Sequence, residues 1–336
     1  MAGLIFSEGS GLQDSIFGKS QEPIKMFIEK RAEAFEEKSM LPEIFNMDRS
    51  NHWAEKFATL TAMEGFQPVG ENGAYPLDGM QEGYTKVLEH MTWKDSFSLS
   101  REIIDDAKLL NLKSRPQSFI TAYYRTREKF GAALMGAALG KKTSMEFAGH
   151  KFDAAAADGQ PLFSKSHPSK VKGGSQSNLF ADAFSADALV ALEERMQGFK
   201  GDNGELLDVL PTTIIIPNNY KLKQAVFSVI GAEKDPDVPG GNGANFVFGR
   251  WNVIVWNYLN QYVTDGAAPW IVMDRQYNED YGSAVWLDRV KLEVRSELAD
   301  NDANVWKGYS RFIAGFNDWR GFAVGGVDGG DRLISA

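Results

Sequence analysis

Residues 51–99 contain the sequence feature that most restricts the fold, namely two strand-like runs separated by a long segment rich in glycine and proline. The first run, 57–63, alternates loosely between apolar and polar residues, and the second run covers 87–99. The intervening segment, 65–83, holds five glycines and two prolines but few long aliphatic side chains. Two strands around such a tip predict a long hairpin. Because a lone hairpin is only marginally stable in water, this one should pack on another surface.

Two helices are expected in the first 140 residues. The first begins near Pro23 and has a one-face apolar stripe at spacings of four, four and three residues, formed by Ile24, Ile28, Ala32 and Phe35. Residues 100–140 predict the longest helix, in which Ser100 caps a first part and Pro116 restarts the helix. Small residues dominate the end of this helix, so another element should approach it closely there.

The rest of the chain predicts more helices and most of the strands. Residues 141–182 and 235–243 are expected to be mostly loop. The expected elements are a helix over 183–200 capped by Ser185, a buried strand over 209–217, a helix from Asn218 or Asn219 to Ile230, and strands at Phe246–Phe248, Asn252–Trp256, Trp270–Met273, Ala284–Val294 and between Trp306 and Val324. Helices early and strands late indicate an α+β fold class.

Composition narrows the class of protein. The chain has 36 Lys and Arg against 45 Asp and Glu, a net charge of −9, whereas general nucleic-acid binders usually show a basic face. It has no cysteine, so disulfides, thiolate nucleophiles and cysteine-bound metals are excluded. The longest uncharged run of small and apolar residues, 131–140, is half of the roughly 20 residues that a membrane span needs. We therefore expect a soluble protein with no membrane partner.

Motifs that would indicate an enzyme are incomplete. A phosphate-binding loop ending at Ser20 would need glycine at position 13, which is Gln13, and the calcium-loop-like run from Asp300 has Val305 in place of its glycine. The four histidines show no metal-binding spacing, and His167 is expected to be a loop residue. No nucleophile-elbow sequence is present. We expect no catalytic, cofactor-binding or metal-binding residues, no cofactor and no enzyme activity.

We do not expect an arm, a long hairpin and a long helix to bury all their apolar residues inside one globule, and we expect them to reach neighbouring copies. In this context the sequence resembles major capsid proteins of tailed bacteriophages with the Hong Kong 97-type fold, and more closely the Mu-like head-subunit group. The segments that carry the resemblance are Leu162–Pro168, Gly173–Leu179, Leu189–Met196, Gly204–Asn218 and Arg311–Arg320.

The resemblance implies a division of the chain. The expected parts are an N-terminal arm at 1–50, an extended E-loop hairpin at 51–99 that lies on an adjacent subunit, a peripheral domain with a spine helix at 100–182, an axial domain at 183–283, and strands that return to the peripheral domain, with the C-terminus, at 284–336. Within the axial domain, 235–243 is the candidate loop at the symmetry axis.

The resemblance also implies a function. Copies of the chain would self-assemble into hexamers and pentamers of an icosahedral phage head around double-stranded DNA, which they contact only weakly and non-specifically. Portal and scaffold proteins, and a decoration protein, are the other expected partners, and assembly would take place in the cytoplasm of the host bacterium before the protein resides in the virion capsid. Some family members crosslink a lysine to an asparagine, but Lys56, Lys86 and Lys94 beside the hairpin are expected to be solvated, so no crosslink is assigned.

Two alternatives stay open from the sequence. The first is an encapsulin, the shell protein of a bacterial nanocompartment with the same fold. The second is a soluble enzyme or ligand-binding protein without a recognisable motif.

Overall fold

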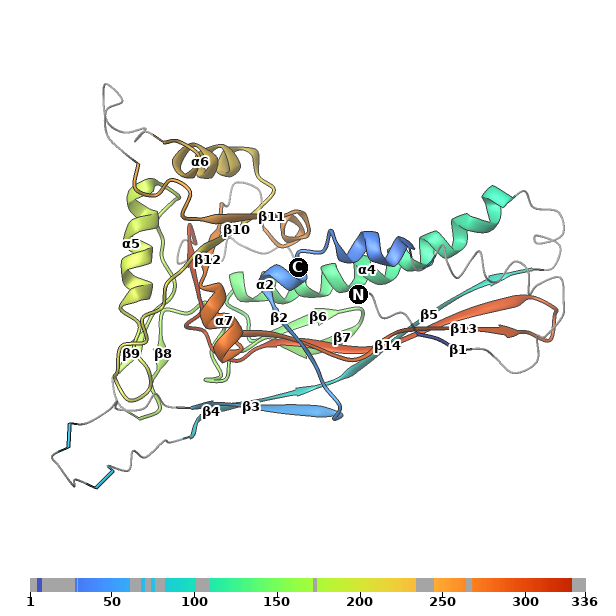
Figure 1. Ribbon diagram of the computed structural model, residues 1–336, viewed down its shortest axis with the longest axis horizontal. Coiled ribbons are helices and arrows are strands. Elements are labelled where there is room, and N and C mark those ends of the chain that lie inside the picture. The colour runs from blue at the N-terminus through green and yellow to red at the C-terminus, as the bar shows by residue number, and fades with distance from the viewer. Residues whose placement is uncertain are drawn as a thin grey trace.

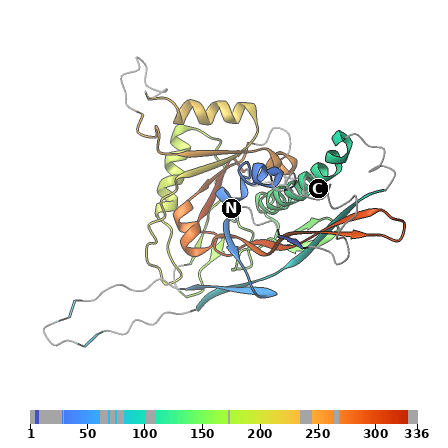
Figure 2. The same cartoon turned by 45° about the vertical axis from the view of Figure 1, so that its right-hand side comes forward.

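The computed structural model describes residues 5–7, 28, 30–60, 68–69, 74–75, 82–100, 109–171, 174–233, 245–263 and 268–327. Two sheets organise the fold, and each has helices beside it (Figures 1 and 2). The mixture of helices and strands confirms the predicted α+β class. No helix within the described ranges is long and apolar enough to cross a membrane.

The larger sheet has five strands and is built around one long antiparallel pair, β13 (Ala284–Leu298) and β14 (Asn304–Phe316). Strand β5 (Met91–Leu99) pairs with the other edge of β14. Two strands from the start of the chain, β1 (Ile5–Ser7) and β2 (Asn46–Arg49), run parallel to β13. The N-terminal region is therefore attached to the same sheet as the C-terminal strands.

The longest helix, α4 (Leu109–Leu139), lies along one face of this sheet (Figure 1). Within the described residues it runs unbroken through Pro116, so the predicted restart at this proline is wrong. One missing backbone hydrogen bond does not end a helix whose length is packed against a sheet. The small residues near its end do permit close approach, because a Cβ on Gly136 would lie 2.4 Å from the side chain of Tyr262.

The predicted stripe of the N-terminal helix is confirmed where the structure describes it. Residues 30–36 are helical, Ile28 and Ala32 are fully buried, and Phe35 stacks on Tyr124 of α4 at 5.5 Å between ring centroids. Ile24 lies outside the described residues.

The second sheet has the strand order β11 (Asn252–Trp256), β10 (Thr213–Pro217), β12 (Trp270–Met273) and β15 (Phe322–Gly325). Helices α5 (Ala186–Gln197) and α6 (Tyr220–Ile230) lie beside it, capped by Ser185 and Asn219 as predicted. The remaining elements are α2 (Leu41–Ile44), β3 (Ala54–Leu60), β4 (Glu82–Glu89), β6 (Ser144–Phe147), β7 (His150–Asp153), β8 (His167–Pro168), β9 (Ser175–Gln176), the 3-10 helix η1 (Asn257–Tyr262) and α7 (Arg275–Tyr281).

Two local predictions need correction. Phe246–Phe248 is a turn and not a strand, because only Val247 of the three is buried and the run is too short to pair with a neighbour. The 141–182 region contains two small hairpins, β6–β7 and β8–β9, where mostly loop was expected. The candidate axis loop at 235–243 lies outside the described residues.

Candidate functional site: the root of the hairpin

The predicted hairpin forms from β3 and β4, which pair antiparallel with Phe57 opposite Lys86. The second strand-like run is divided at His90. Its first part belongs to the hairpin, whereas β5 beyond His90 joins the large sheet beside β14. Most of the hairpin's tip, 61–81, falls outside the described residues.

The two faces of the hairpin have different surroundings. On the inner face Leu88 is buried and lies against Gly315, where an added Cβ would come within 2.4 Å of the leucine side chain. On the outer face Val87 is 53% exposed, and Lys56 opposite it is exposed as well. One face is therefore held by the body of the subunit, and the other exposes Val87 to solvent.

Lys86 was expected to be solvated, and this prediction is wrong. It is only 5% exposed, and its Nζ donates to Asp153 Oδ2 at 2.6 Å and to the carbonyl of Ala155 at 2.8 Å. Lysine is rarely buried without a partner, so this ion pair fixes the hairpin to the β7 region. Lys56 and Lys94 are exposed, as expected.

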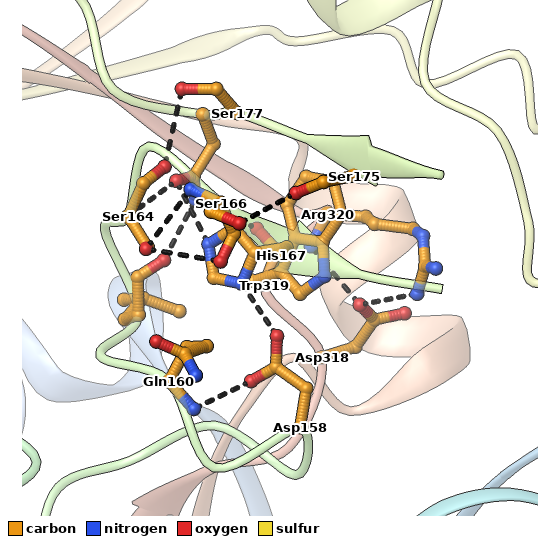
Figure 3. A network of polar contacts seen from close by, with 12 residues as sticks. Asp158, Gln160, Ser164, Ser166, His167, Ser175, Ser177, Asp318, Trp319 and Arg320 are labelled. Atoms are coloured by element: carbon orange, nitrogen blue, oxygen red, sulfur yellow. Dashed lines mark hydrogen bonds and ion pairs between the residues drawn. The ribbon is translucent and has the colours of Figure 1, made fainter. Parts of the chain in front are cut away.

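His167 lies in a buried polar network beside the hairpin root, and its assignment as a loop residue is wrong (Figure 3). Its Nδ1 lies 2.6 Å from Asp158 Oδ2, its Nε2 lies 3.1 Å from Asn178 Oδ1, and its ring stacks on Trp319 at 4.3 Å. Because both ring nitrogens already have partners, the ring has no nitrogen left to activate a nucleophile.

The amide of Asn178 is the centre of this network. Its Nδ2 donates to the carbonyls of Leu162 at 2.7 Å and Phe322 at 3.0 Å, and its Oδ1 accepts from the N–H of Ser164 at 3.0 Å. These partners fix which end of the amide is oxygen, so both nitrogens of His167 face acceptors. The amide of Asn178 therefore connects the ring of His167 to three backbone segments.

A second buried charge cluster adjoins the first. Arg320 donates to Asp202 Oδ1 at 2.8 Å and to Asp318 Oδ1 at 3.2 Å, and Tyr277 donates its hydroxyl to Asp318 Oδ2 at 2.8 Å. Burial, and then the charge of Asp318, raises the pKa of Tyr277 well above its ordinary value. Each buried carboxylate here has a cationic or hydroxyl partner. A buried polar network that is satisfied in this way makes the local structure rigid.

The hairpin is connected directly to these charge clusters by hydrogen bonds. Lys170, which follows β8, donates to the carbonyl of Gly83 in β4 at 2.6 Å, and Ser169 donates to the carbonyl of Asp202 at 3.0 Å. We call the two charge clusters, together with these contacts to the hairpin root, the polar junction. Three of the segments that carried the family resemblance, 162–168, 173–179 and 311–320, meet in it. No spacing pattern in the sequence predicts the junction, although these segments were a signal that pointed to it.

The described residues contain no group of three or more His, Cys, Asp or Glu side chains able to hold a metal ion. The arrangement of the polar junction suits a structural role. It joins the hairpin root, the short β8–β9 hairpin and the start of β15 by charged, buried hydrogen bonds, which are stronger than neutral ones.

Comparison with known proteins assigns the fold and the family. The model of the phage capsid protein family matches residues 83–325. Among solved structures, the chain is similar to a protein of Mycobacterium phage Patience, with 13% identity, a TM-score of 0.52, and 93% of this chain and 89% of that chain covered. It is also similar to the capsid structure of cyanophage P-SCSP1u, with 14% identity, a TM-score of 0.50, and coverage of 85% and 87%.

The holo-SrpI encapsulin complex from Synechococcus elongatus matches with a TM-score of 0.46 at 11% identity, over 88% of each chain. No curated protein sequence matches the chain. The finer resemblance to the Mu-like head-subunit group stays a prediction. The family match includes β4 from Gly83 onward, β5, β13 and β14 of the larger sheet, the whole second sheet and the polar junction. The chain therefore belongs to the phage capsid protein family, and it is a major capsid subunit with the Hong Kong 97-type fold.

Proposed function

We propose that copies of this protein form hexamers and pentamers that close into an icosahedral phage head around double-stranded DNA. Membership of the family already implies self-assembly into a capsid lattice and residence in the virion. The observation that supports this mode of assembly is the hairpin, which is fixed on its inner face and exposes the apolar side chain of Val87 on its outer face. Burial of such side chains between subunits would stabilise the lattice.

In this proposal the role of the chain is structural and not catalytic. The division into an arm at 1–50, an E-loop hairpin at 51–99, a peripheral domain at 100–182 with 284–336, and an axial domain at 183–283 belongs to the same proposal. Portal, scaffold and decoration proteins are its proposed partners, and the host cytoplasm is the proposed place of assembly.

Removal of the hairpin tip tests the proposal. A variant that lacks residues 65–80 keeps β3, β4 and the Lys170 contact to Gly83, so the subunit should fold with an unchanged circular dichroism spectrum. It should fail to form shells in electron micrographs, because the contact to the neighbouring subunit is gone. Shells formed in normal yield would contradict the proposed role of the hairpin.

A point substitution refines the test. Val87→Glu places a charge on the exposed outer face and should reduce shell yield, because an unpaired carboxylate would be buried in the contact. Lys151→Glu, at an exposed position of β7, is the matched control and should leave assembly unchanged.

A further inference from the structure

The hairpin and α4 lie on opposite faces of the large sheet. Side chains alternate between the faces of a strand, so positions seven apart in β14 point to opposite sides. A Cβ on Gly308 would lie 2.4 Å from Phe119 of α4, whereas a Cβ on Gly315 would lie 2.4 Å from Leu88 of β4. Ser310, on the same side as Gly308, contacts Tyr123 of α4 at 3.1 Å, which agrees with this assignment. Figures 1 and 2 show the same arrangement.

This arrangement restricts what can reach each face in a shell. In a single-layered shell of identical copies, every copy turns the same face to the same side. A hairpin on one face is then separated by the shell wall from features on the helix face of its neighbours. This step rests on the proposed function, because it assumes that the chain forms a closed shell.

A pocket of about 490 Å³ opens on the helix face. It lies between residues 35–49, the middle of α4, the β11–η1 corner and β13. Its apolar lining includes Phe35, Met47 and Tyr258, of which Met47 is 36% exposed. Such a lining can accept an aromatic or aliphatic side chain of a ligand.

The main acidic groups around the pocket are already engaged. Glu128 accepts hydrogen bonds from Ser39 Oγ, from the N–H of Met40 and from Trp256 Nε1, at 2.5 to 3.1 Å. Asp288 forms a two-pronged ion pair with Arg127 at 2.7 and 2.9 Å. These carboxylates are therefore neutralised or saturated within the subunit.

In contrast to these carboxylates, several cationic side chains that line the pocket lack an ion-pair partner among the described residues. Among the described residues, no ion pair joins a carboxylate to Lys38, Arg49, Arg125 or Lys291, although all four line the pocket. The pocket thus combines apolar lining residues with positive charges that have no ion-pair partner in the described part of the chain. That combination attracts a ligand with several negative charges and an apolar anchor.

We propose that this pocket binds a short acidic peptide segment, with one aromatic or aliphatic anchor, that belongs to a separate polypeptide on the helix side of the shell. The hairpin of a second copy has suitable charge, since residues 57–85 carry four acidic residues and no Lys or Arg, but it lies on the other face. Nucleic acid is disfavoured because Asp48 sits among the rim cations and the chain carries a net charge of −9. Separate carboxylates fit such a mixed rim better than a continuous phosphate chain.

The test uses full-length protein, both as unassembled subunits and as shells. Fluorescence anisotropy measures binding of a short fluorescein-labelled peptide in which glutamates surround a central Leu-Phe pair. The comparison ligands are the same peptide with glutamine in place of glutamate, and a single-stranded oligonucleotide of similar length. The double variant Arg125→Glu and Lys291→Glu should weaken binding of the acidic peptide by about tenfold or more. Arg125→Lys should retain it.

Lys129→Glu is the matched control, because Lys129 is exposed on α4 and does not line the pocket. Equal binding of the glutamine peptide, tighter binding of the oligonucleotide, or an equal loss in Lys129→Glu would overturn the proposal. Binding is measured on unassembled subunits as well, so a failure to form shells would count against the proposed function alone. Absence of peptide binding to subunits that do form shells would count against the pocket alone.

Discussion

At the scale of single residues, the polar junction depends on one buried amide. Asn178→Ala removes hydrogen bonds to two buried carbonyls, of Leu162 and Phe322, and to the partly buried N–H of Ser164. Each unsatisfied buried group costs about 1–3 kcal/mol, so the free energy of unfolding should fall by at least ~2 kcal/mol. Denaturant unfolding of unassembled subunits measures this, with Asn51→Ala at an exposed position as the control. A loss no larger than in the control would contradict the structural role assigned to Asn178.

His90 makes a second prediction at this scale. It separates β4 from β5, and both its ring nitrogens are buried without a hydrogen-bond partner among the described residues. Burial lowers the pKa of His90 below its ordinary value of 6.5, and the charges of Arg289 and Arg311 lower it further, although Glu55 and Asp288 oppose them. The unfolded chain therefore binds the proton more readily than the folded one.

The expected result is a loss of stability as pH falls below about 6.5. Thermal midpoints measured between pH 7.5 and pH 5 should fall more steeply for the wild type than for His90→Gln. His150→Gln, at an exposed histidine, should follow the wild type. Equal slopes for the wild type and His90→Gln would show that His90 does not titrate in this way.

At the scale of elements, the contact between α4 and the large sheet requires a glycine. Gly308→Ala would place a Cβ 2.4 Å from Phe119 Cζ, so the helix would have to move away from the sheet. We expect a loss of roughly 1–3 kcal/mol in the free energy of unfolding. Gly198→Ala is the control, since its Cβ would meet nothing closer than 3.4 Å. Equal stability of the two variants would contradict the close packing of α4.

The helices and strands also show which parts of the fold can be predicted from the sequence. Elements with local signals were predicted well, since Ser185 and Asn219 cap their helices, and β11 and β12 have the predicted bounds. The break at His90 was missed because two different partners, β3 and β14, decide where the strand divides.

The polar junction was missed for a related reason. Arg320 and Asp202 are 118 residues apart, and no spacing rule connects them. The pocket on the helix face likewise brings together four separate segments, so no local pattern could have predicted it.

At the scale of the whole molecule, charge and composition agree with a shell subunit. A net charge of −9 disfavours strong binding to phosphates, which would leave enclosed DNA free to move. Because the chain has no cysteine, no disulfide can join its copies, and subunit contacts depend on buried surface. We expect part of that surface on the outer face of the hairpin, around Val87.

Electron microscopy of the purified full-length protein is the most direct test of whether its copies form a phage head. Closed shells of uniform size are expected, in which a reconstruction shows hexamers and pentamers and each hairpin lies over an adjacent subunit. A protein that stays monomeric and compact at all concentrations would contradict this expectation.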